Sequence, residues 1–259
     1  MIIDNKTRIM TVDLEPDLRS STYKSMEIIP DLLDLFDRYG IKATFFTVTN
    51  LLDKHEFEIK EIAKKHEIAS HSHTHNWLTE KNSEWEMKTS LKLFKDYKIP
   101  VQGFRAPGFI TTKNHFELLK KVGYSYDASL ARFFPGRYNN LTMPKKPFLR
   151  NSIVEFPMPT FIPPSINSGL PYLKLFHPIS KVFPKPYMFY LHPWEFLEKK
   201  ELIADRSLVG NLLQRNNGKK AIIIFKNYLE KCDSNWISCR EWMERSKVNN
   251  NHNNNGTRN

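Results

Sequence analysis

The segment Glu67-Ile68-Ala69-Ser70-His71-Ser72-His73-Thr74-His75-Asn76 decides how this chain is organised. It begins as a short, partly apolar strand and continues into three imidazoles alternating with hydroxyl groups. In an extended segment His71, His73 and His75 would share one face, whereas in a helical turn His71 and His75 would lie at positions i and i+4. Either conformation allows two imidazoles to meet one cation.

Imidazole nitrogen is a ligand that zinc and its first-row relatives accept readily, and a catalytic site adds further protein ligands while leaving one position open for water. Histidine-rich runs also occur in solvated loops and purification tags, and short motifs give false matches. This run lies far inside the chain and follows a strand pattern, which is not where a tag stands. The segment therefore predicts a metal site that still needs a third, acidic ligand.

Residues 8–17, R-I-M-T-V-D-L-E-P-D, supply candidate acids. The segment opens with the pattern of a buried strand and ends in the carboxylates of Asp13, Glu15 and Asp17 around a proline. In α/β folds the carboxyl ends of parallel strands form the edge of the sheet at which chemistry takes place. We therefore expect these acids at that edge.

Strand and helix patterns alternate along most of the chain. Beyond the two strands above, strands are expected at residues 42–48, 102–109, 124–129, 153–157 and 187–195, and helices at 26–39, 53–65, 84–94, 113–122, 205–213 and 219–231, with a short strand and helix at 236–245. Residues 132–180 are proline-rich and show only the strand at 153–157. Repeated strand-helix units predict a parallel barrel, and the absence of a glycine-rich dinucleotide turn or P-loop disfavours nucleotide chemistry.

The composition fits one domain. The 259 residues are 40% hydrophobic and 26% charged, which is ordinary for a globular protein. We expect a single catalytic domain over residues 1–247 and a disordered tail over 248–259, because the asparagine-rich tail has nothing to bury. No apolar run has the length of a membrane span and the first residues lack a secretory signal, which predicts a cytoplasmic protein. Cys232 and Cys239 are expected to be reduced.

The net charge of +11 favours an anionic partner, whether an acidic glycan, a lipid surface or a nucleic acid. The lysines are scattered through helical segments and no nucleic-acid module is recognisable, so nucleic-acid binding is not expected. Peripheral contact with anionic lipid agrees with the charge, but the sign alone does not choose among these partners.

Five stretches carry polar residues to expected strand ends: T-V-D-L-E-P at 11–16, S-H-S-H-T-H at 70–75, F-R-A-P-G-F at 104–109, Y-D-A-S at 126–129 and Y-L-H-P-W-E at 190–195. In this order, and over nearly the whole chain, they resemble the polysaccharide deacetylase superfamily of carbohydrate esterases (family 4-like), in the branch whose first motif reads D-x-E. The resemblance implies an irregular (β/α) barrel of about seven parallel strands. It also implies hydrolysis, by a metal-bound water, of N-acetyl groups on amino sugars of a polysaccharide or lipid-linked saccharide.

The resemblance makes His71 and His75 metal ligands and Asp13 the general base. The common family pattern has two adjacent acids, but here Leu14 follows Asp13 and cannot bind metal. Glu15 is therefore the expected third ligand, with Asp17 as the alternative. The expected metal is Zn²⁺, which lowers the pKa of its bound water to roughly 7, and Co²⁺, Ni²⁺ or Mn²⁺ are alternatives.

The remaining motifs supply groups around this centre. Arg105 would hold the Asp13 carboxylate by a charge-assisted hydrogen bond. The backbone N–H groups near Gly108 and Phe109, after Pro107, would face the developing oxyanion. Many relatives carry a tyrosine where Gly108 stands, so we expect a more open groove.

His192 would act as the general acid that protonates the departing amine, because imidazole titrates near neutral pH. Asp127 would orient that imidazole, and Trp194 would stack on a sugar face.

Two alternatives keep the same site. The activated water could instead remove a formyl group or open a cyclic amide, or the protein could be a sugar-binding relative without catalysis. The joint presence of Asp13, Arg105 and His192 with both histidine ligands argues against a mere binder, which needs no general acid.

Overall fold

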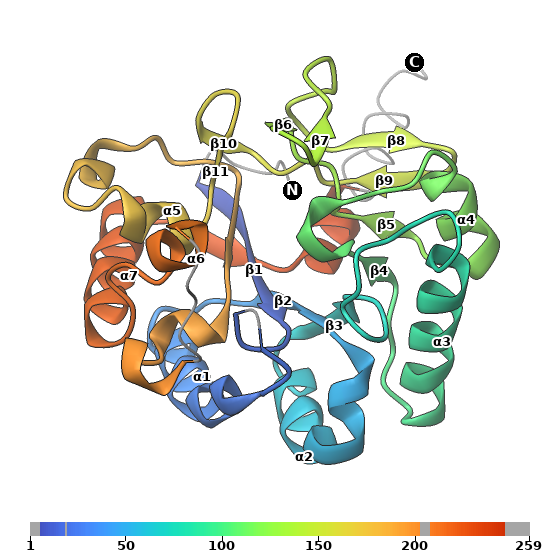
Figure 1. Ribbon diagram of the computed structural model, residues 1–259, viewed down its shortest axis with the longest axis horizontal. Helices are drawn as coiled ribbons and strands as arrows, with labels where there is room; N and C mark the ends of the chain where they lie inside the picture. Colours follow the sequence, from blue (N-terminus) through green and yellow to red (C-terminus); the bar gives the residue numbers. More distant parts are fainter. Residues whose placement is uncertain (1–5, 19, 203–207, 247–259) are drawn as a thin grey trace, which may run out of the picture.

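The computed structural model describes residues 6–18, 20–202 and 208–246 (Figure 1). The predicted tail at 248–259 lies outside the described residues. The central strand, β1 (Thr7–Leu14), is flanked by β12 (Met188–Leu191) and β2 (Ala43–Thr47), and both neighbours run parallel to it. β13 (Asn235–Ile237) pairs with the first residues of β1.

The main sheet has the order β12-β1-β2-β3-β4-β5-β9-β8. The strands not yet described are β3 (Glu67–Ser70), β4 (Gly103–Phe104), β5 (Tyr126–Asp127), β9 (Ile153–Glu155) and β8 (Phe148–Arg150). Neighbours from β12 to β9 pair in parallel and β8 adds an antiparallel edge. The path therefore holds seven parallel strands and ends at β12 and β8, which confirms the predicted α/β fold as an open barrel.

Helices cover the outside of this sheet (Figure 1). They are α1 (Ile29–Arg38), α2 (Leu52–Ala63), α3 (Ser83–Asp96), α4 (His115–Val122), α5 (Leu170–Leu175), α6 (Leu208–Leu213) and α7 (Lys219–Cys232), and residues 239–246 form a last helix. In α1 a stripe of apolar residues at helical spacing is buried, and Gly40 follows the helix with a φ of 62°. The core between helices and sheet includes Phe36, Phe45, Phe189 and Phe225.

The proline-rich segment holds more structure than its sequence predicts. It contains two short hairpins, β6 (Phe133–Phe134) with β7 (Tyr138–Asn139) and β10 (Thr160–Ile162) with β11 (Ile166–Asn167). It also contributes β8 and α5. Strands of two or three residues are too short for the alternation of polar and apolar residues to be recognised, which is why these elements were not expected.

The strand register places the polar residues together. Val12 lies opposite Leu191, so Asp13, the next residue of β1, and His192, the first residue after β12, lie side by side at the carboxyl edge of the sheet. Ser70 is likewise paired with Phe104, which precedes Arg105. The parallel pairing therefore carries residues far apart in sequence to one edge of the sheet, as the strand-end motifs predict.

Two smaller expectations can be compared with the structure. Cys232 and Cys239 are both buried and unpaired, which agrees with the predicted reduced thiols. Within the described residues, every helix falls short of the length and apolarity that spanning a lipid bilayer demands.

Gly103 in β4 is a point at which the fold is sensitive to one methyl group. A Cβ atom at this position would lie 1.8 Å from Cζ of the buried Tyr126 ring. We expect Gly103→Ala to lower the free energy of unfolding by about 1–3 kcal/mol, because the ring must be displaced from a packed core. Urea unfolding measures this effect. The matched control, Gln102→Ala at the exposed neighbouring position, should change stability by less than about 0.5 kcal/mol, and equal stability of the two variants would contradict the predicted contact.

Candidate active site

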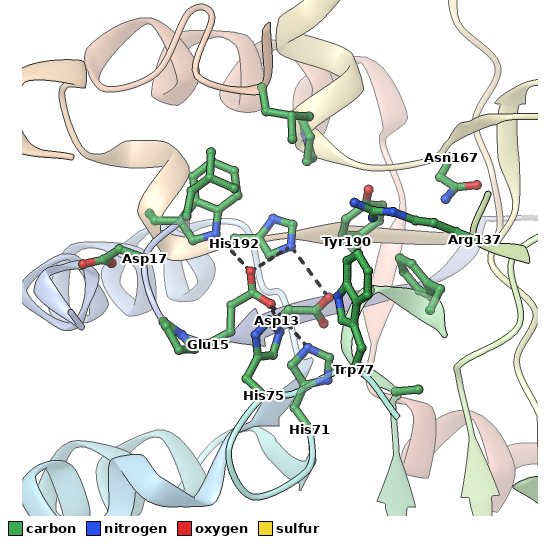
Figure 2. A pocket seen from close by; sticks show the side chains of 18 of the residues that line it. Asp13, Glu15, Asp17, His71, His75, Trp77, Arg137, Asn167, Tyr190 and His192 are labelled. Atoms are coloured by element: carbon green, nitrogen blue, oxygen red, sulfur yellow. Dashed lines mark hydrogen bonds and ion pairs between the residues drawn. The ribbon is translucent and has the colours of Figure 1, made fainter. Parts of the chain in front are cut away.

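A cavity of about 590 Å³ opens at the carboxyl ends of the strands. Its size lies within the range of small-molecule sites. Asp13, Glu15, His71, His75 and His192 line it, and Figure 2 shows their side chains turned toward one another. The structure therefore brings together, in one cavity, the acids and imidazoles that the sequence motifs single out.

Three of these side chains form a group that can hold a metal ion. One ligand atom each from Glu15, His71 and His75 lies within 4.8 Å of the others. Glu15 Oε2 is 2.7 Å from His75 Nε2 and 3.4 Å from His71 Nε2. His71 Nδ1 is 2.8 Å from the carbonyl oxygen of Arg105, which can only accept a hydrogen bond. The proton of a neutral His71 ring is thereby placed on Nδ1, and its Nε2 lone pair faces Glu15.

The histidine loop reaches this geometry through a turn that is neither extended nor helical. Ser72 and His75 have φ values of 68° and 66°, which non-glycine residues rarely adopt. The N–H of His75 donates to Ser72 Oγ at 3.1 Å, and the His71 and His75 rings lie 5.0 Å apart. Such strained residues persist only where surrounding contacts hold them, and they cluster at functional sites.

Glu86 of α3 holds the loop from behind. Its buried carboxylate accepts the N–H groups of His73 and Thr74, each at 2.9 Å, and also the hydroxyl of Thr74. The His73 ring packs 5.3 Å from the Trp85 ring, and His73 is not among the residues that line the cavity. Nothing in the helical pattern of α3 distinguishes Glu86 from a surface acid.

Glu15 and Asp17 have separate environments. The carboxylate of Asp17 accepts from the N–H groups of Lys24 and Ser25 at 2.8 and 3.1 Å, and from the Thr22 hydroxyl at 2.7 Å. Figure 2 shows it to one side, away from the two imidazoles. The structure therefore places Glu15, and not Asp17, beside them.

Several neighbours fix the Glu15 carboxylate and its charge. Trp194 Nε1 donates to Glu15 Oε1 at 3.2 Å. Burial raises the pKa of Glu15, but the imidazoles of His75 and His192 and hydrogen bonds from His71 and His75 act against burial, and the pKa lies well below its ordinary value. The carboxylate is therefore ionised at neutral pH.

Arg105 holds Asp13 as the F-R-A-P motif predicts. Its Nη1 is 2.5 Å from Asp13 Oδ1 and 3.0 Å from Thr11 Oγ1, and its Nε donates to the carbonyl oxygen of Ala128 at 3.2 Å. The guanidinium also lies 4.1 Å from the centre of the Phe46 ring, and the whole side chain is buried. With Oδ1 engaged, the other oxygen of Asp13 is the one that faces His192, at 3.9 Å from Nε2.

His192 is oriented by Glu195, whose role the sequence did not reveal. His192 Nδ1 is 3.1 Å from Glu195 Oε1, and the backbone N–H of His192 donates to the same oxygen at 3.0 Å. The other oxygen of Glu195 is 2.9 Å from Lys174 Nζ, and both side chains are fully buried. Burial lowers the pKa of His192, but the carboxylates of Glu15, Glu195 and Asp13 outweigh it and raise the pKa to about 9.

Asp127 does not take the role predicted for it. Its carboxylate is 2.9 Å from His115 Nε2 and accepts the Ser129 hydroxyl at 2.5 Å, and no contact with His192 occurs among the described residues. Ser129 Oγ in turn accepts the N–H of Ala106 at 2.8 Å, so Asp127 supports the loop that follows Arg105. The position of Glu195, three residues after His192 in H-P-W-E, is the signal that could have identified the orienting acid.

Trp194 also differs from expectation. The side chain is 2% exposed, and its ring stacks on the His192 ring at 4.9 Å with an interplanar angle of 23°. A buried ring already stacked on an imidazole has no free face for a sugar. Its contribution is the hydrogen bond to Glu15 and the packing that holds His192.

The P-G-F turn is a short 3₁₀ helix, Pro107–Phe109, at the cavity wall. The Phe109 N–H donates to the carbonyl oxygen of Ala106 at 3.0 Å, so Gly108 keeps the candidate oxyanion donor. A Cβ atom at Gly108 would lie 3.1 Å from Trp77 Nε1. The indole of Trp77 therefore occupies the space beside Gly108 in which a more open groove was expected.

Comparisons with known proteins agree with this fold. A family model described as polysaccharide deacetylase matches residues 4–126. The peptidoglycan deacetylase of Helicobacter pylori is 32% identical over 124 residues, which cover 46% of this chain and 42% of that protein. The chain thus spans less than half the length of the curated relatives it matches.

Two solved structures share the fold. A putative polysaccharide deacetylase from Mycobacterium smegmatis superposes with a TM-score of 0.58 at 18% identity, covering 95% of this chain and 93% of that one. A CE4 family pseudoenzyme from Bacillus anthracis gives a TM-score of 0.51 at 14% identity, covering 91% and 64%. Residues 4–126 are therefore similar to polysaccharide deacetylases, and the open barrel is a fold that this chain shares with the solved structures named above.

Proposed function

We propose that this protein is a metal-dependent hydrolase that removes N-acetyl groups from amino sugars of a polysaccharide or lipid-linked saccharide. The observation that carries the proposal is the convergence, in one cavity, of the Glu15-His71-His75 group with Asp13 and His192. The Asp13 carboxylate and the His192 imidazole lie 3.9 Å apart beside the potential ligands, where a base and an acid can act on the same amide.

The donor set fits a divalent cation. Two imidazoles and one carboxylate are the ligands of several catalytic zinc sites, and Co²⁺, Ni²⁺ and Mn²⁺ also accept them. When bound, such a cation polarises the amide carbonyl and lowers the pKa of a water molecule to about 7. The hydrogen bond from His71 Nδ1 to the Arg105 carbonyl supports the fit, because metal-binding histidines commonly donate their second nitrogen in this way.

The protein's own residues provide the proton transfers. Asp13 Oδ2 accepts the proton of the attacking water, because Arg105 engages Oδ1. His192 Nε2 donates a proton to the departing nitrogen, while Glu195 holds Nδ1 and so fixes the ring. The Gly108 N–H stays a predicted donor to the developing oxyanion. The C–N bond breaks, and acetate and a free amino sugar are the products.

The named relatives bear on the substrate and on the alternatives. The H. pylori relative is named as a peptidoglycan deacetylase, which supports an N-acetylated glycan as substrate class. The B. anthracis structure is titled a pseudoenzyme, so the fold alone does not imply activity. Asp13 and His192, both in position for proton transfer, support an active enzyme here. Deformylation and cyclic-amide opening would use the same residues, and product analysis separates them from deacetylation.

Asp13→Asn tests the proposed base. We expect the rate of acetate release from N-acetylglucosamine oligomers to fall by about 10²- to 10⁴-fold, because the amide cannot accept the proton. Acetate and formate are quantified in parallel, with Zn²⁺ and with chelator, and metal content is measured by elemental analysis. The control is Asp34→Asn on the exposed face of α1, which should retain full activity. Full activity of Asp13→Asn would exclude the proposed base.

Glu15→Gln and Asp17→Asn test the third ligand. We expect Glu15→Gln to weaken Zn²⁺ affinity by at least about 100-fold, since losing a direct ligand should exceed the cost of losing a supporting group. The Asp17→Asn variant should still bind Zn²⁺ but should be less stable, because the Asp17 carboxylate accepts hydrogen bonds from the N–H groups of Lys24 and Ser25. The Zn²⁺ affinity is measured by competitive titration, and the free energy of unfolding is measured with urea. The reverse pattern would identify Asp17 as the ligand.

A further inference from the structure

One wall of the cavity has no part in the proposed chemistry. We name it the Arg137 wall; it consists of Trp77, Phe134, Arg137, Tyr138 and Asn167. Phe134 and Tyr138 belong to the β6–β7 hairpin with Arg137 in its turn, Asn167 ends β11, and Trp77 follows the histidine loop. These segments are brought together only by the tertiary fold.

Arg137 is the one arginine or lysine among the described residues that line the cavity. Its guanidinium carbon lies 5.0 Å from the centre of the Trp77 ring and 5.1 Å from that of Phe134, within the range of cation–π contacts. Figure 2 shows the side chain extending over Trp77 toward the side of the cavity that holds Tyr190. The described residues provide neither a carboxylate nor a hydrogen-bond acceptor for its guanidinium. An arginine held by aromatic rings keeps its planar set of N–H donors for an oxyanion.

Asn167 and Tyr138 add polar groups to the same wall. Asn167 is 1% exposed, and its Nδ2 donates to the hydroxyl oxygen of Tyr138 at 3.2 Å. Its Oδ1 is buried and finds no hydrogen-bond partner among the described residues. A buried carbonyl oxygen without a partner is unfavourable, so the position of Asn167 is maintained by the hydrogen bond to Tyr138 and by the packing around it. Because Tyr138 accepts from Asn167, its own O–H remains to be donated.

Arg137 also affects the electrostatics of Tyr172, another residue that lines the cavity. Burial raises the pKa of Tyr172, a further lining residue, to about 12, and Arg137 acts in the opposite direction. The acids Asp13 and Glu15 lie instead beside the imidazoles at the strand ends. The cavity therefore has an acidic region at the potential metal ligands and a cationic region at Arg137.

We propose that Arg137, with Tyr138 and Asn167, binds an anionic group, a carboxylate or a phosphate, on the saccharide whose N-acetyl group is removed. The guanidinium and the Tyr138 hydroxyl donate to the oxyanion, and Asn167 orients the Tyr138 hydroxyl through its Nδ2. This inference rests on the proposed function for the nature of the ligand. It narrows the substrate class from N-acetylated glycans in general to acidic ones.

Arg137→Met tests the wall, because methionine keeps an apolar stem against Trp77 and Phe134 while the charge is removed. The matched control is Arg150→Met. Arg150 is also exposed and lies 4.7 Å from the centre of an aromatic ring, that of Phe116, but it does not line the cavity. Both variants remove one arginine from an aromatic contact, so they differ mainly in their position relative to the cavity.

Binding is measured by calorimetry at low salt, with and without Zn²⁺, for three N-acetylglucosamine tetramers: a neutral one, one with a lactyl carboxylate and one with a phosphate monoester. We expect the wild-type protein and Arg150→Met to bind one or both acidic tetramers about 10- to 100-fold more tightly than the neutral tetramer. Arg137→Met should lose this preference and keep its affinity for the neutral tetramer. The acid with the larger preference identifies the carboxylate or the phosphate as the recognised group.

Two results would overturn the proposal: equal affinity of the wild-type protein for all three tetramers, or an unchanged preference in Arg137→Met. Acetate release from the same tetramers separates this inference from the proposed function. A binding preference without acetate from any tetramer supports the Arg137 wall and counts against the deacetylase. Acetate release with equal kcat/KM for neutral and acidic tetramers supports the deacetylase and counts against the wall.

Discussion

The buried guanidinium of Arg105 is the interaction on which the site depends. From the end of β4 it reaches Asp13 on β1 and the carbonyl oxygen of Ala128 after β5, and it therefore ties three strands together. Its own carbonyl oxygen accepts from His71 Nδ1. A buried charge is tolerated only when it is paired and fully hydrogen-bonded. The contacts that allow Arg105 to be buried in the core are therefore the same contacts that orient Asp13 and His71. A change at Arg105 would therefore disturb the proposed base, Asp13, and the potential metal ligand His71 together.

A second buried pair supports the opposite side of the site. Lys174 and Glu195 form an ion pair without solvent exposure, and Glu195 uses its other oxygen to hold His192. Lys174 also lies 5.4 Å from the Trp194 ring, whose N–H holds Glu15. Because removing one partner leaves an uncompensated buried charge, these residues constrain one another. His192 and Glu15 are therefore positioned by the same cluster.

The sequence predicted those site residues that a short local pattern carries to a strand end. Parallel strands in register bring such ends to one edge, which is why Asp13, Glu15, His71 and His192 meet. The prediction that Asp127 orients His192 failed because the order of strands in a sheet cannot be derived from local sequence patterns. Four strands separate β5, which carries Asp127, from β12, which precedes His192. Glu86, Lys174 and Arg137 were missed because their partners are set by tertiary contacts.

The net charge of +11 predicts the kind of partner but not the place where the partner binds. A positive total favours anionic partners but says nothing of where they bind, because the lysines are spread over helices and loops along the whole chain. Within the cavity the balance differs: Asp13 and Glu15 lie beside the imidazoles, and Arg137 is the only described lysine or arginine in the lining. The cavity therefore presents two regions of opposite charge to a bound ligand. If the proposed acidic saccharide is the substrate, this polarity favours binding with its charge toward Arg137 and its acetamido group toward His71 and His75, and would set orientation as well as affinity.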